Sequence, residues 1–227
     1  MWCVVPAAGR GMRVGGEIPK QYLPIAGKPL LMHTLERVAS HPRVTGLMLV
    51  LAPDDKHWSP ITRVQGKPLR TAIGGEHRAD SVLAGLGALV EHIDSAEFVL
   101  IHDAARPCVR HADITRLLEL GIPGGGGLLA TALSDTLKRA DAENRVIATE
   151  PREARWRAQT PQMFRLGELI AALESCRRSG ITATDEAMAM ERTGARPLLV
   201  PGSGDNIKVT TQTDFALAEF MLERRET

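Results

Sequence analysis

Short apolar runs and amphipathic stretches alternate along most of the chain. The apolar runs show no polar alternation and predict strands at 3–6, 47–51, 70–73, 98–101, 128–132 and 197–200. Apolar residues recurring at helical spacing predict helices at 30–40, 78–90, 112–120, 166–179, 186–193 and 212–223. Strands that are apolar on both faces and separated by helices indicate an α/β fold with a mostly parallel central sheet covered on both sides.

The segment 134–164 interrupts this rhythm. It predicts two short strands, 136–139 and 146–149, joined by the polar turn 141–144. An isolated two-stranded hairpin is marginally stable, so this one should pack on its own domain or on a second subunit. The second option makes it a dimerisation arm. We therefore expect one domain over 1–227 that carries a β-arm at 134–158.

Composition narrows the classes of partner. Lys and Arg number 28 against 27 Asp and Glu, which gives a net charge of +1 and argues against a surface for duplex nucleic acid. The three cysteines are far apart, which argues against a zinc site or a disulfide framework and for a reducing compartment. No run approaches the ~20 apolar residues of a membrane span, and residues 1–9 lack a signal-peptide pattern. We expect a cytoplasmic protein.

The first strand leads into a small-residue, basic loop, PAAGRGMR, which we interpret as a nucleotide-phosphate loop. Gly9 and Gly11 permit close approach of backbone N–H groups to phosphate, and Arg13 and Lys20 bring positive charge. The dinucleotide fingerprint fails because Val14 stands where G-x-G-x-x-G needs its third glycine, and no Walker-type loop is present.

Ligands of such sheets lie at the carboxyl ends of the strands, and unusual residues follow several predicted strands. The segment GGEHRADSV offers glycine backbone and the Ser81 hydroxyl, and Asp80 or Ser81 can cap the next helix. HDAARP places Asp103 directly after an apolar strand, with Arg106 close by. His102 is interpreted as a polar residue that leaves the core and is given no role. Lys208 lies between two apolar residues and needs an anionic partner.

Taken in order, VPAAGRGMR, PKQY, GGEHRADSV, HDAARP, DT, TPQ, TDEA and DNIKVT resemble the 2-C-methyl-D-erythritol 4-phosphate cytidylyltransferase family. The resemblance runs from Val4 to about Leu222. It implies a Rossmann-like three-layer α/β/α domain and a homodimer in which the β-arm reaches the neighbouring active site. It also implies the reaction of CTP with methylerythritol phosphate to give a cytidine diphosphate derivative and pyrophosphate. The implied cofactor is Mg²⁺ held mainly by the CTP phosphates, with no protein metal ligand assigned.

The resemblance also implies roles for individual residues. Catalytic contacts to the triphosphate fall to Arg13, Lys20 and Lys208. CTP binding falls to Pro6, Ala7, Ala8, Gly9, Gly11, Gly75, Glu76, Ser81, Asp103 and Ala104. Binding of the sugar phosphate falls to Asp103, Arg106, Thr136, Arg152, Thr160 and Thr184, with Thr136 and Arg152 supplied by the partner arm.

Two alternatives remain open at the level of sequence. A cytidylyltransferase for another polyol phosphate, such as ribitol 5-phosphate, shares the loop, the DAARP-like motif and the DNIK-like lysine. A non-catalytic nucleotide-binding regulator is the alternative from a different class. Retention of Arg13, Lys20, Asp103 and Lys208 speaks against it, because a sensor has no need of cations for a leaving group.

Overall fold

A computed structural model of the chain describes residues 1–9 and 18–224. Its centre is an eight-stranded sheet with the order β12-β8-β11-β7-β1-β4-β6-β5. The strands are β1 (Trp2–Pro6), β4 (Gly46–Leu51), β5 (Arg63–Val64), β6 (Lys67–Ile73), β7 (Phe98–Ile101), β8 (Gly127–Ala132), β11 (Trp156–Arg165) and β12 (Leu198–Pro201). The predicted strands are all present, and the sheet is mostly parallel as expected.

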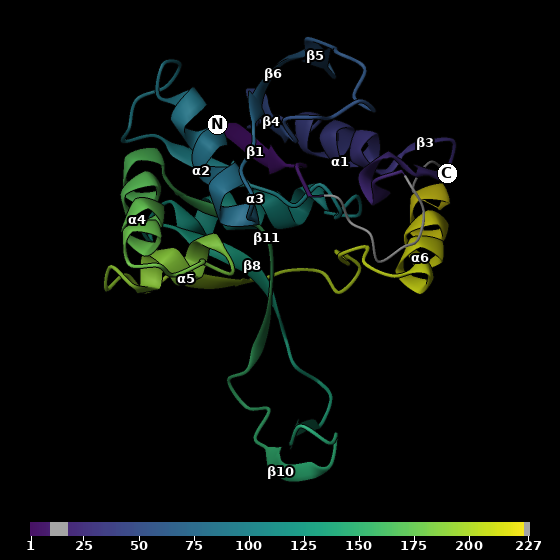
Figure 1. Cartoon of the computed structure of the whole chain (residues 1–227), viewed down its shortest axis with the longest axis vertical. Helices are drawn as coiled ribbons and strands as arrows, with labels where there is room; N and C mark the ends of the chain where they lie inside the picture. The colour runs from purple at the N-terminus through teal and green to yellow at the C-terminus, as the bar shows by residue number, and fades with distance from the viewer. Residues whose placement is uncertain (10–17, 225–227) are drawn as a thin grey trace.

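Alternating side chains of the central strands fill two separate cores. Val5 of β1 packs against the core under α1 (Leu30–Ala39) and α3 (His111–Gly121), whereas its neighbour Val4 packs under α2 (Arg78–Leu89), α4 (Leu166–Arg178) and α5 (Glu186–Glu191). Because successive residues of a strand point to opposite faces, a strand apolar throughout must be covered on both sides. The expected three-layer α/β/α arrangement is confirmed (Figure 1).

One central strand was not predicted. β11 lies antiparallel between β7 and β8, and its register against β8 shifts between Ala158 and Gln162. The first residues of β11, Trp156 to Ala158, pair with β8, so the predicted arm 134–158 ends inside a strand of the main sheet.

The hairpin itself forms as predicted. Strands β9 (Leu137–Ala140) and β10 (Val146–Glu150) pair antiparallel around the turn that follows Asp141. Figure 1 shows this hairpin standing clear of the body at the end of the extended β8–β11 stem. Val146 and Ile147 are more than half exposed at its tip.

A third, smaller core joins the C-terminal helix to the region around the first loop. In it α6 (Gln212–Glu223) packs through Phe215 and Ala218 against Ile25 and Leu30. Two short strands, β2 (Pro24–Ile25) and β3 (Lys28–Pro29), and the 3₁₀ turn η2 (Lys20–Tyr22) complete this corner. This core keeps Lys20 and Lys208 on the same side of the sheet. Among the described residues, no helix has the length and apolarity to span a membrane.

Candidate active site

A cavity of about 300 Å³ opens where β1, β6 and β7 reach their carboxyl ends. Parallel strands end at the same edge of a sheet, so residues from distant parts of the chain converge there. The predicted site residues that line it are Pro6, Ala7, Ala8, Gly9, Lys20, Gly75, Glu76, Ser81, Asp103, Ala104 and Lys208.

The start of the first loop is held by a residue for which no role was predicted. The side-chain amide of Gln21, which is almost fully buried, donates hydrogen bonds to the carbonyls of Ala7 (2.8 Å) and Gly9 (2.9 Å). The neighbouring Lys20 donates from Nζ to the carbonyl of Val209 at 2.7 Å. The PKQY segment therefore links the first loop to the segment that carries Lys208.

The opposite wall of the cavity is built by the turn before α2. The Gly75 amide donates to Ser81 Oγ at 3.3 Å, and a Cβ placed on Gly74 would lie 2.7 Å from both Ala8 Cβ and Ser81 Oγ. Glycine at 74 is therefore required for the two loops to approach this closely. Of the two predicted helix caps, Asp80 takes the role, because its carboxylate accepts from the His77 amide at 3.1 Å.

Three cations surround the carboxylate of Asp103 at the centre of the cavity. Arg78 Nε lies 2.9 Å from Oδ1, while Lys208 Nζ lies 2.9 Å and Arg106 Nε 3.5 Å from Oδ2. Burial alone raises the pKa of Asp103, but Arg78, then Lys208 and Arg106, hold it well below its usual range. The anionic partner predicted for Lys208 is thus Asp103, whereas the contact of Arg78 with Asp103 was not predicted.

Behind Asp103, a buried chain of hydrogen bonds fixes the backbone. The Asp103 amide donates to Thr160 Oγ1 (2.9 Å), which is 3.0 Å from His102 Nδ1, and His102 Nε2 lies 3.0 Å from the Arg106 carbonyl. Since a carbonyl can only accept, Nε2 carries the proton and Nδ1 accepts from the Thr160 hydroxyl. Burial lowers the pKa of His102 to about 4, which keeps the ring neutral.

This network corrects the interpretation of His102. The residue does not leave the core: it is fully buried and holds the turn between Asp103 and Arg106. The network continues to the DNIK segment, where Asn206 Nδ2 donates to the Thr160 carbonyl (2.8 Å) and Arg106 Nη1 donates to the Asn206 carbonyl (2.7 Å). Three motifs far apart in sequence are thereby joined by hydrogen bonds.

Comparison with known proteins identifies the family to which this chain belongs. The family model of 2-C-methyl-D-erythritol 4-phosphate cytidylyltransferase matches residues 1–224. The chain belongs to this cytidylyltransferase family.

Relatives and solved structures agree with the family assignment. Proteins named 2-C-methyl-D-erythritol 4-phosphate cytidylyltransferase from Xanthomonas oryzae pv. oryzae and Xylella fastidiosa are each 53% identical over 99% of this chain, and the matches cover 83% and 98% of those proteins. A crystal structure of a 4-diphosphocytidyl-2C-methyl-D-erythritol synthase superposes with a TM-score of 0.82 at 34% identity, covering 97% of both chains. The Francisella tularensis cytidylyltransferase also gives 0.82, at 32% identity, covering 97% of this chain and 98% of that one.

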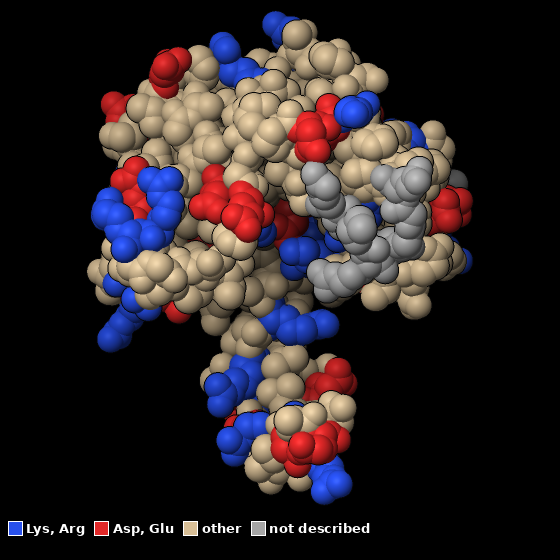
Figure 2. Space-filling model, in the orientation of Figure 1, with Lys and Arg blue, Asp and Glu red and all other residues tan. Residues whose placement is uncertain are grey.

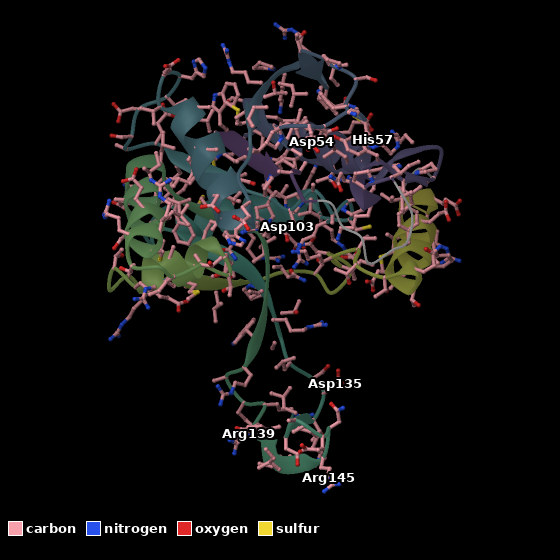
Figure 3. The ribbon with its side chains drawn as sticks, viewed as in Figure 1. Asp54, His57, Asp103, Asp135, Arg139 and Arg145 are labelled. Atoms are coloured by element: carbon pink, nitrogen blue, oxygen red, sulfur yellow. The ribbon has the colours of Figure 1, made fainter. Side chains whose placement is uncertain are left out.

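Gly11 and Arg13, to which family resemblance gave roles, fall outside the described residues. Other residues with roles implied by the resemblance are described and lie outside the main cavity. Thr136 and Arg152 are exposed residues of the arm, and Arg152 Nη1 donates to the Ser134 carbonyl within it. Figure 3 shows Asp135, the neighbour of Thr136, well separated from Asp103. Thr184 is exposed and donates from Oγ1 to the sulfur of Met188 at 3.4 Å.

Arg106 and Thr160 occupy different positions around a second cavity. This cavity, of about 270 Å³, is lined by Arg106, Asn206, Gln159 and Lys208, so Lys208 stands between the two spaces. Thr160 is buried behind it with its hydroxyl already bonded on both sides. Its geometry is that of a residue which positions Asp103.

The side chains that line the main cavity can be compared with those that the implied metal, Mg²⁺, usually takes as ligands. In the described part of the chain, no group of three or more His, Cys, Asp or Glu side chains could hold a metal ion. The cavity does offer the carboxylates of Asp103 and Glu76. Mg²⁺ keeps several waters and takes one or two carboxylates together with substrate phosphates, so this donor set fits an ion carried chiefly by a nucleotide.

Proposed function

We propose that this chain transfers the cytidylyl group of CTP to 2-C-methyl-D-erythritol 4-phosphate, giving 4-diphosphocytidyl-2-C-methyl-D-erythritol and pyrophosphate. This is a step of non-mevalonate isoprenoid biosynthesis. The observation that carries the proposal is the convergence of Lys20 and Lys208, from opposite ends of the chain, on the cavity that contains Asp103. Small residues of the first loop, with the Gly75 backbone and the Ser81 hydroxyl, form the wall suited to the nucleoside.

The residue types suit this reaction. A phosphate oxygen of the sugar phosphate is already an anion at neutral pH, so no general base is needed. It forms a bond to the α-phosphorus of CTP as the bond from that phosphorus to the oxygen bridging to the β-phosphate breaks, and pyrophosphate leaves with that electron pair. The barriers are the approach of two anions and the charge on the leaving group. Preorganised cations lower both by position and electrostatics.

Lys20 and Lys208 are assigned to the phosphates of CTP, together with Arg13. Lys208 Nζ is held at the cavity by Asp103 and Lys20 Nζ by the Val209 carbonyl, so both ammonium groups are positioned before any ligand arrives. Mg²⁺, bound mainly through the CTP phosphates with Asp103 or Glu76 nearby, would supply further charge neutralisation. The backbone at Ala7, Ala8 and Gly9, with Ser81, would hold the cytidine.

The second cavity is assigned to the sugar phosphate. Arg106 and Lys208 give it positive charge, and the space adjoins the main cavity through Lys208. Figure 2 shows basic side chains gathered near the centre of this face and where the arm leaves the body. Thr184, at the start of the α5 segment, is kept as a candidate contact, and Thr160 acts through Asp103.

Thr136 and Arg152 would complete that cavity from a second copy of the chain. The hairpin stands away from its own body, and Asp135 is far from Asp103 (Figure 3). A homodimer with exchanged arms is the arrangement in which these side chains reach a cavity. The exposed apolar tip residues Val146 and Ile147 also favour a covered arm.

Pyrophosphate release tests the proposal. Purified chain, CTP and Mg²⁺ are mixed with 2-C-methyl-D-erythritol 4-phosphate or, in parallel, ribitol 5-phosphate. We expect release only with CTP and a preference for methylerythritol phosphate, with the cytidine diphosphate product identified by mass. A preference for ribitol 5-phosphate would assign the chain to the other polyol. CTP binding without release under either condition would make it a nucleotide-binding regulator.

A further inference from the structure

Arg78 and Glu186 form a second layer of charge behind Asp103. Arg78 is the first residue of α2 and Glu186 the first residue of α5. Arg78 donates from Nε to Asp103 Oδ1 (2.9 Å) and from Nη1 and Nη2 to the two oxygens of Glu186 (2.6 and 3.1 Å). The Glu186 side chain is 0% exposed, whereas Arg78 reaches the wall of the main cavity.

This geometry divides the Asp103 carboxylate between two sets of partners. Oδ1 is taken by Arg78, which leaves Oδ2 for Lys208 and Arg106. Glu186 accepts one N–H from each terminal nitrogen of Arg78, and Asp103 accepts from Nε. The planar guanidinium can serve two carboxylates at fixed angles, and a lysine ammonium cannot reproduce that fork.

A purely structural role explains the pair poorly. Removing two charges from water costs free energy that their attraction often fails to recover, and well-packed apolar residues frequently replace such pairs without loss of stability. Here three cations, Arg78, Arg106 and Lys208, face two carboxylates, which leaves one net positive charge beside the cavity. Glu186 therefore sets how much positive charge the site presents to an anionic ligand.

We propose that Arg78 and Glu186 are positioning residues: Glu186 orients Arg78, and Arg78 fixes Asp103 so that its other oxygen, Oδ2, holds Lys208 at the cavity. The inference rests on the proposed cytidylyl transfer, in which Lys208 contacts the phosphates. Arg78 acts through Asp103, and Glu186 acts through Arg78, so their effect on turnover is indirect.

Two variants test the pair. Arg78→Lys keeps the positive charge but loses the planar guanidinium that contacts two carboxylates. Arg78→Met combined with Glu186→Met removes both charges together, so that no unpaired charge is left buried and the fold is protected. We expect each to lower kcat by at least about tenfold, because Lys208 loses its defined position; a factor of ten corresponds to ~1.4 kcal/mol in the transition state. The matched control is Arg116→Lys, since Arg116 pairs with the buried Asp113 at 3.0 Å outside both cavities. It should keep wild-type turnover.

A second substitution at Lys208 separates positioning from stability. If Arg78 acts through Asp103 on Lys208, Arg78→Lys should lower kcat about tenfold in the wild-type background but cost little further in a Lys208→Ala background, because the group that it positions is already gone. A substitution that only destabilised the fold would lower activity in both backgrounds. Arg116→Lys should leave kcat unchanged in either background.

The outcomes are distinct. If the double Met variant is folded and has wild-type kcat, or if Arg78→Lys costs as much kcat in the Lys208→Ala background as in wild type, the pair does not act through Lys208 and the inference is wrong. If Arg78→Lys alone retains wild-type kcat, a positive charge at this position is enough for turnover and the planar guanidinium has no role. Should wild type release no pyrophosphate at all, the proposed function fails. The comparison is then made on CTP affinity by calorimetry, where unchanged Kd in both variants would also refute the pair.

Discussion

At the scale of the residue, the proposed reaction depends most on Lys208, which lines both cavities. Lys208→Ala removes a preorganised charge, a loss that typically costs ~3–4 kcal/mol in the transition state. We expect kcat to fall by at least about a hundredfold, and the same for Lys20→Ala, measured by steady-state pyrophosphate release. Asp103 keeps Arg78 and Arg106 as partners, so the Lys208→Ala fold should persist.

Lys28→Ala is the matched control for both lysines. Lys28 pairs with Glu36 of α1 at 2.5 Å and lines neither cavity. Its loss should leave turnover unchanged. Near-normal kcat in Lys208→Ala or Lys20→Ala would remove that lysine from the mechanism, whereas an equal loss in Lys28→Ala would point to a general effect of lost charge.

His102 gives a residue-level prediction about stability and pH. Its pKa is about 4 in the folded chain against 6.5 for an ordinary histidine, so the unfolded state binds more protons between these values. The His102 contribution is therefore complete above about pH 6.5 and declines as pH falls toward 4. Between pH 7 and pH 5 it amounts to about 2 kcal/mol.

Urea unfolding of wild type and His102→Asn at pH 7 and pH 5 measures this. The variant is expected to lose about 2 kcal/mol less than wild type on acidification, because asparagine can hydrogen-bond and does not titrate. Equal losses in the two proteins would mean that His102 is not held neutral by burial.

Sequence patterns identified polar and charged residues that are unusual next to apolar strands. Asp103 directly after an apolar strand and Lys208 between apolar neighbours both led to the cavity. Arg78 and Gln21 were passed over although both stand in quoted motifs. Their importance lies in contacts with other parts of the chain: the partners of Gln21 are 12 and 14 positions away and those of Arg78 are 25 and 108 positions away, and no local pattern reveals such contacts.

At the scale of the element, β11 shows where pattern reading fails. Its sequence contains Pro161 and several polar residues, which are unusual in a central strand. Pro161 lies where the register against β8 shifts, and Gln162 is satisfied by distant partners, Asp185 Oδ2 (3.0 Å) and the Ala187 amide (2.8 Å). Strands and helices with local periodicity were predicted, whereas this strand depends on tertiary hydrogen bonds.

The start of α6 yields a prediction for an element. Asp214 Oδ2 accepts from the Thr210 hydroxyl (2.7 Å) and from the amides of Thr210 (2.9 Å) and Thr211 (2.8 Å). The hydrogen bond from the Thr210 hydroxyl, together with those from the two amides, lowers the pKa of Asp214 to about 2. Partial desolvation opposes this shift but is outweighed. Asp214→Ala is expected to reduce the free energy of unfolding by about 1 kcal/mol at pH 7, the usual cost of a lost cap.

Urea denaturation at pH 7 checks this, with Glu223→Ala at the other end of α6 as control. An acidic residue near a helix C-terminus opposes the helix dipole, so Glu223→Ala should be neutral or slightly stabilising. Because the Asp214 pKa is depressed, its contribution is present above about pH 4 and declines toward pH 2. If Asp214→Ala unfolds at the wild-type urea concentration, these three hydrogen bonds do not stabilise the helix.

At the scale of the whole molecule, the arm is the feature that a single chain leaves unexplained. Thr136 and Arg152 lie on a hairpin that stands away from the body (Figure 1). Under the proposed exchange, each active site takes Lys208 from one protomer and Arg152 from its partner. Arg152→Ala should chiefly raise the KM for the sugar phosphate. A change confined to CTP binding would contradict the role given to the arm.

Mixing two impaired variants tests the exchange directly. Lys208→Ala and Arg152→Ala are unfolded together, refolded as a mixture and assayed at low sugar phosphate. In an arm-exchanged mixed dimer, one site combines Lys208 of one protomer with Arg152 of its partner and is intact, while the other site carries both defects. Random assortment makes half of the dimers mixed, so activity should recover to about a quarter of wild type. If each site used its own arm, no mixed dimer would contain an intact site, and activity would stay at the average of the two variants.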